Sequence, residues 1–222
     1  MNTTQQQAYR NVGYYLAGVS LWFLIALIWH GAVHPFAGAS AEQALPLIRE
    51  RAGGWFMMHF FFSFAAVFVA GAALAVVNLR SFLTDSLPGL VGWSVLAIIA
   101  IIGANLAIME ATVQGDAAVA GNLETFAMWY ALSRGVELLF ILFPLGFLAI
   151  TSVDLRAANP LTPRWASALA LLGAALVVPA IVGGSGFRIV AFGRLWGAAA
   201  LPMLWFIWLG LRLASLPDGA HQ

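Results

Sequence analysis

The chain contains no cysteine and no lysine, and it has few charged residues of either sign. Without thiols it can form neither disulfides nor thiolate metal sites. Charged residues make up 9% of the 222 residues, the formal net charge is +1, and the ten arginines form no long basic cluster. A protein that binds along the phosphate backbone of a nucleic acid needs such a cluster, so this composition argues against nucleic acid as a partner.

Apolar residues fill most of the sequence. They make up 62% of the chain, well above the usual share in a soluble domain, and the mean hydropathy is +0.91. A helix needs about 20 apolar residues to cross a bilayer. The sequence therefore predicts an all-α polytopic membrane protein, a single transmembrane domain over residues 1–222 with six helices. The expected spans are about 11–34, 54–77, 89–111, 125–150, 165–182 and 187–213.

The segments between the spans are short and polar. Residues 41–52 (AEQALPLIRERA) favour a short helix at the membrane interface, and residues 112–125 (TVQGDAAVAGNLET) favour a loop, because Gly, Asp and Asn mark turns. The positive-inside rule favours a cytoplasmic N-terminus in a bacterial-type inner membrane, since more arginines then face the cytoplasm. Arg10, Arg80, Arg156, Arg164 and Arg212 lie on that side, Arg49 and Arg51 on the other.

Ionisable residues within the expected spans gather in the outer half of the bundle. Charged groups inside a membrane are costly and usually face the bundle interior or a wet cavity. With six alternating spans, the end of the first, the start of the second, the end of the third, the start of the fourth and the start of the sixth lie on one side. The residues brought together there are His30, His34, His59, Glu110, Arg134, Glu137, Arg188 and Arg194.

The histidines have a spacing that suits metal binding. His30 and His34 lie four residues apart, on one face of a helix. His59 from the next span and a carboxylate from Glu110 or Glu137 would complete a ligand set for zinc, copper, iron or manganese. In an enzyme, one of these glutamates would move a proton and Arg134 would orient Glu137 or neutralise an anionic intermediate.

Structural explanations for the same residues remain open. His34 precedes a proline and is compatible with an interfacial histidine in water, while His59 is placed to donate a hydrogen bond to a carbonyl or to Asn105. Arg134 and Glu137 are three residues apart, close enough for an ion pair that only fixes helix packing. Trp55 and other tryptophans near the span ends fit interfacial belts.

The run Gly54-Trp55-Phe56-Met57-Met58-His59 follows a first span that ends in Trp29-His30. It resembles the corresponding region of bacterial styrene oxide isomerases, small membrane proteins with haem b at a subunit interface. The resemblance implies that His59 ligates a haem iron acting as a Lewis acid on an epoxide oxygen. It covers one loop and the flanking helix ends, and this chain has two further spans and different residues after the histidine.

These patterns favour a membrane metalloenzyme with a transition metal ion or haem b, acting on a small or lipophilic substrate. Isomerase, hydrolase and oxidoreductase activities are not distinguishable from residue types. Two other classes stay open: a transporter or channel with a His/Glu/Arg relay, and an assembly subunit of a membrane complex. Besides the lipid bilayer, the expected partners are the substrate and either a second copy of the chain or other subunits of a complex.

Overall fold

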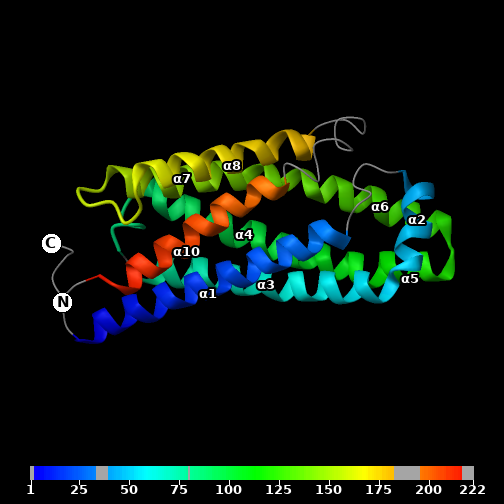
Figure 1. The fold of residues 1–222 in the computed structure, drawn as a ribbon, viewed down its shortest axis with the longest axis horizontal. Helices are drawn as coiled ribbons and strands as arrows, with labels where there is room; N and C mark the ends of the chain where they lie inside the picture. The colour runs from blue at the N-terminus through cyan, green and yellow to red at the C-terminus, as the bar shows by residue number, and fades with distance from the viewer. Residues whose placement is uncertain (1–2, 34–39, 80, 183–195, 217–222) are drawn as a thin grey trace.

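The computed structural model describes residues 3–33, 40–79, 81–182 and 196–216, and within these ranges the chain is helical apart from short connections (Figure 1). The elements in order are α1 Thr3–Val33, α2 Ala41–Glu50, α3 Ala52–Asn78, α4 Leu87–Met109, the π-helical segment η1 Glu110–Gln114, α5 Gly115–Ala120, α6 Leu123–Glu137, the 3₁₀ segment η2 Leu138–Ile141, α7 Leu142–Arg156, α8 Arg164–Val182, the 3₁₀ segment η3 Trp196–Ala199 and α10 Ala200–Ala214.

Four helical stretches are long and apolar enough to cross a membrane. They run over Thr4–His30, Ala52–Asn78, Leu87–Ala120 and Leu123–Arg156, and two shorter apolar stretches cover Arg164–Pro179 and Ala200–Ala214. The all-helical, membrane-type fold is thus confirmed. Residues 183–195, which hold the expected start of the sixth span, lie outside the described residues.

The long helices close into a ring. Helix α1 packs on α3, α3 on α4, α4 on α7, α7 on α8, α8 on α10, and α10 returns to α1. The main core fills the half of this ring where α1 begins and α10 ends. Its centre is an aromatic group in which the Phe147 ring lies 5.2 Å from Trp205 and 5.4 Å from Phe206, both edge-on.

Small residues allow α1 and α10 to approach closely. A Cβ atom added to Gly13 would lie 2.5 Å from the backbone nitrogen of Ala214 and from the carbonyl oxygen of Gly210. A Cβ on Gly210 would lie 2.7 Å from the backbone nitrogen of Ala17. Each helix thus presents two small residues four apart, a pattern that lets helix backbones touch in membranes.

The helical run Leu87–Ala120 is longer than a membrane crossing. Its 34 residues extend about 50 Å at 1.5 Å per residue, against roughly 30 Å of hydrocarbon. The expected loop over residues 112–125 is therefore wrong: η1 and α5 continue the helix to Ala120. The chain turns only at Gly121, with φ of 70°, and Asn122, whose side chain caps α6 by accepting from the Thr125 amide.

Helix α2 covers this extended end of the bundle, on the right in Figure 1. It begins with a capping box in which Ser40 and Gln43 bond each other's backbone amides, and it buries Ala44 and Ile48. These two side chains form a small second core with Trp55, α5 and α6. The expected short helix over residues 41–52 is confirmed, and it closes the end of the bundle over the start of α3.

Candidate functional site

Trp55, His59 and Glu110 form a buried hydrogen-bonded group where α3 meets η1. The Nε2 atom of His59 lies 3.1 Å from a carboxylate oxygen of Glu110. The indole N–H of Trp55 donates to the Glu110 backbone carbonyl over 2.8 Å, and the Trp55 and His59 rings lie 4.1 Å apart. His59 is only 1% exposed and Glu110 7%, so water reaches neither group freely.

The hydrogen bonds of His59 fix which of its nitrogens carries a proton. Its Nδ1 atom lies 2.9 Å from the backbone carbonyl oxygen of Trp55, and a carbonyl can only accept. Nδ1 is therefore the donor, and in a neutral imidazole Nε2 is then an acceptor. Two acceptors, Nε2 and the Glu110 carboxylate, face each other at 3.1 Å. That contact is favourable only when a proton or another cation lies between them.

His30 is the second histidine at this site. Its ring centroid lies 5.5 Å from that of His59 in an edge-on arrangement and 5.5 Å from that of Phe62. The structure thus brings together imidazoles from the first two spans with a carboxylate of the third. Asn105, the other expected partner of His59, is exposed and donates to the carbonyl of Ile101 instead.

Glu110 opens the π-helical segment η1. Its carbonyl accepts from the backbone amide of Gly115, five residues on, and from the Trp55 indole. A Cβ on Gly115 would lie 3.6 Å from the Trp55 ring, so the indole packs along the whole segment. Short π-helical insertions are rare in proteins and are frequent at functional sites.

Arg134 and Glu137 lie one turn apart near the end of α6. Their side chains approach to 3.7 Å, as the spacing of three residues predicts, and each is 19% exposed. The Arg134 guanidinium also donates to the Tyr130 hydroxyl over 2.7 Å and lies 5.0 Å from the centre of that ring. Helix α6, which carries this pair, packs against η1, so the pair borders the His59 site.

The full expected metal set is not visible in the described part of the chain. There, no group of three or more His, Asp or Glu residues is arranged to hold a metal ion. His34, Arg188 and Arg194 lie outside the described residues. The metal assignments to His30, His34, His59 and Glu137 therefore stay predictions. Among the described residues, Glu110 is the carboxylate that contacts a histidine.

An apolar cavity lies about one helical turn from His59, toward the middle of the bundle. It has a volume of about 90 Å³ and is lined by residues of α1, α3, α4, η2 and the last helices. Phe62, which contacts His30, forms part of its wall together with Phe23, Gly103 and Phe140. The polar site and an apolar cavity are thus neighbours.

The opposite end of the bundle holds a buried polar network that sequence analysis missed. Asp154 is fully buried and accepts from the backbone amides of Leu161 at 2.7 Å and Thr162 at 3.1 Å. Thr162 and Ser167 share the indole N–H of Trp205, each at 3.0 Å. The network ties the α7–α8 connection to α10. The only signal was an aspartate at the end of a span before a Pro-Leu-Thr-Pro turn.

Comparison of the chain with protein-family models, with curated proteins and with solved structures found no match.

Proposed function

We propose that this chain is an integral membrane enzyme in which His59 and Glu110 hold one exchangeable cation beside an apolar substrate cavity. The cation is a proton used in acid–base chemistry, or a transition metal ion that these two side chains help to bind. The observation that carries the proposal is the 3.1 Å contact between the His59 Nε2 atom and the Glu110 carboxylate in a buried site. Buried ionisable pairs of this kind are concentrated at functional sites.

In the proton version, the pair exchanges a proton with the substrate. The backbone carbonyl of Trp55 accepts from Nδ1 of His59 and so fixes the tautomer of the imidazole. The proton then moves between Nε2 of His59 and a carboxylate oxygen of Glu110. Such a positioned acid–base pair accelerates reactions typically by 10²–10⁴-fold. The apolar surroundings keep water from competing for the proton.

In the metal version, His59 and Glu110 would supply one nitrogen and one oxygen. Within the described residues no third His, Asp or Glu is arranged with them to hold an ion, so the further ligands would come from outside those residues. A bound ion would polarise a substrate oxygen or lower the pKa of a bound water. Imidazole and carboxylate suit zinc, copper, iron or manganese.

The haem version, which the resemblance to styrene oxide isomerases implies, fits this geometry less well. His59 is 1% exposed, and its Nε2 atom faces Glu110 rather than the surface of the bundle. A porphyrin would need a broad open face beside that nitrogen. The geometry therefore favours a single small cation, and an absorption spectrum separates the two versions.

The cavity supports a small lipophilic substrate and an enzyme over a transporter. Its described lining is apolar throughout, from Phe23 and Leu27 on α1 to Met203 on α10. A proton or anion path would need polar groups that continue through this region toward Asp154. Among the described residues, the middle of the bundle offers none on the cavity wall.

The proposal includes six membrane crossings with the N-terminus in the cytoplasm of a bacterial cell. Helix α8 has 19 residues and extends about 28 Å, close to the thickness of the hydrocarbon core. The segment from Trp196 to Ala214 is similarly long. Reporter fusions after residues 52, 121 and 184 should show periplasmic positions, and fusions after residues 85 and 160 cytoplasmic ones.

Elemental analysis and an absorption spectrum of the purified protein test the site. A stoichiometric metal that is lost in both His59→Ala and Glu110→Gln supports the metal version. No metal, together with a His59 NMR signal that moves in Glu110→Gln, supports the proton version. A Soret band that disappears in His59→Ala would establish haem instead.

Glu137→Gln is the matched control, because it removes a carboxylate from the neighbouring Arg134 pair without touching His59. It should leave the metal content and the His59 signal unchanged. The proposed function would be refuted if the protein contained neither metal nor haem and the His59 NMR signal were unchanged in Glu110→Gln.

A further inference from the structure

Gln114 is a buried polar side chain that the proposed chemistry does not use. It is 1% exposed, and neither its amide nitrogen nor its amide oxygen has a hydrogen-bond partner within the part of the chain that the structure describes. Burying both atoms of an amide without partners is destabilising, and native proteins rarely do so. The side chain therefore needs a hydrogen-bond partner that lies outside the described residues.

Gln114 is placed next to the His59–Glu110 pair. It ends the π-helical segment that Glu110 begins, and residues four apart on a helix lie on the same side, about 5–6 Å apart. This segment packs against α3 and α6, the helices that carry His59 and Arg134. The unpartnered amide and the titratable pair thus lie about one turn apart on one buried segment.

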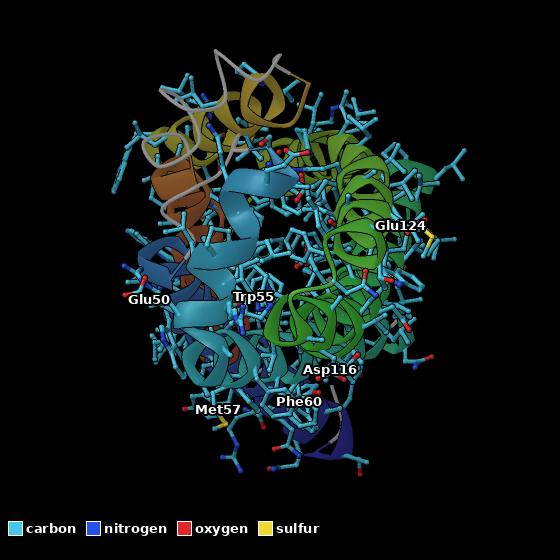
Figure 2. The ribbon with its side chains drawn as sticks, turned by 90° about the vertical axis from the view of Figure 1, so that its right-hand side faces the viewer. Glu50, Trp55, Met57, Phe60, Asp116 and Glu124 are labelled. Atoms are coloured by element: carbon cyan, nitrogen blue, oxygen red, sulfur yellow. The ribbon has the colours of Figure 1, made fainter. Side chains whose placement is uncertain are left out.

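The buried core at this end is apolar, and charged side chains lie around it at the surface (Figure 2). Figure 2 looks onto it and shows Trp55 toward the interior, between α2 and α5, while Glu50, Met57 and Glu124 lie at the periphery. The small core here consists of the buried residues Ala44, Ile48, Trp55, Ala117, Ala118 and Phe126. A ligand that reaches Gln114 must therefore be mostly apolar and carry a small polar group.

We propose that Gln114 binds the polar group of the substrate, that this group is a hydroxyl, and that the apolar part of the substrate extends past His59 and Glu110 toward the apolar cavity. The inference rests on the proposed function and adds the substrate class, a small lipophilic alcohol. The amide offers a donor at Nε2 and an acceptor at Oε1, and a hydroxyl can satisfy both because it accepts and donates. A ketone or an ether would satisfy only Nε2.

Glutamine-labelled protein in lipid nanodiscs tests the proposal directly. The side-chain ¹⁵N–¹H signal of Gln114 is identified by slow exchange with solvent and by its loss in Gln114→Met. The protein is titrated with 1-hexanol and, as a probe of equal chain length without an O–H group, with 1-chlorohexane. We expect the signal to move saturably with 1-hexanol only. The proposal would be overturned if the Gln114 signal did not move with either probe, or moved equally with both.

Gln114→Met gives a second, independent readout. Methionine keeps the volume and removes the unpartnered polar atoms, so we expect the Tm to rise by about 2 °C or more while 1-hexanol binds about tenfold more weakly. Ser63→Ala is the control, because Ser63 is also buried but donates to the Ala104 carbonyl over 3.0 Å, so its Tm should not rise.

A fall in Tm in Gln114→Met with unchanged 1-hexanol binding would mean that Gln114 only holds a buried water, and would overturn the assignment. If Gln114→Met does not fold, the titration of the wild-type protein decides alone. Neither readout requires turnover or a cation at His59. Failure of the hydroxyl subsite is therefore distinguishable from failure of the proposed function.

Discussion

A double-mutant cycle on His59 and Glu110 gives the most informative stability prediction. Removing one partner of a buried ion pair typically costs 3–5 kcal/mol, because the remaining group is left without a partner in an apolar site. Both side chains are almost fully buried, at 1% and 9% exposure, and 3.1 Å apart. We expect His59→Leu and Glu110→Leu each to cost about 3 kcal/mol, the lower end of that range.

The double variant should be far less destabilised than the two single variants suggest. With both polar groups replaced by leucine, no buried charge remains, and such replacements are often close to neutral. We expect a loss of about 2 kcal/mol for the double variant, where additive effects would give roughly 6 kcal/mol. Denaturant unfolding in mixed micelles, followed by circular dichroism, measures the three free energies of unfolding.

The same cycle on Arg134 and Glu137 is the control. These side chains are 3.7 Å apart and each 19% exposed, so we expect a coupling energy of about 1 kcal/mol or less. If the His59 and Glu110 variants are additive within about 0.5 kcal/mol, the two side chains do not act as a pair, and the reasoning behind the site is refuted.

Three further predictions concern packing and hydrogen bonds. Gly13→Ala should cost about 1–3 kcal/mol, because its Cβ would overlap α10 backbone atoms, while Gly18→Ala, with nothing within 4 Å, should be neutral or stabilising in the same unfolding assay. Trp55→Phe should cost about 1 kcal/mol more than Trp93→Phe, because of these two indoles only that of Trp55 donates a hydrogen bond within the described residues; equal losses would contradict this. Asp154→Ala should cost about 3 kcal/mol by leaving buried amides of the α7–α8 connection unpaired, and a Tm equal to that of the wild type would contradict the structural role of the network.

The fold class follows from composition, but the length of the helices does not. A loop was predicted over residues 112–125 because glycine and aspartate, here Gly115, Asp116 and Gly121, are typical of turns. The structure keeps Gly115 and Asp116 helical because the Trp55 ring packs over Gly115 and α2 covers the alanines of α5. These tertiary contacts outweigh local propensity, and the sequence gives no direct sign of them.

The site was predictable in its residue types more than in its pairings. The order of the spans brought His30, His59 and Glu110 to one end, and the structure places them together. Trp55 was expected in the interfacial belt, where indoles are common, yet α2 buries it. Gln114 lies in the segment predicted as a loop, where a glutamine would be solvated. Its burial follows only from the continuation of the helix through this segment.

Histidine ¹⁵N NMR tests the central claim most directly, because it reports which nitrogen of His59 carries a proton. With the His59 signal assigned by its loss in His59→Gln, we expect a protonated Nδ1, held by the Trp55 carbonyl, and an Nε2 whose signal changes in Glu110→Gln. A neutral ring protonated only at Nε2, with a bare Nδ1 and no response to Glu110→Gln, would contradict the account.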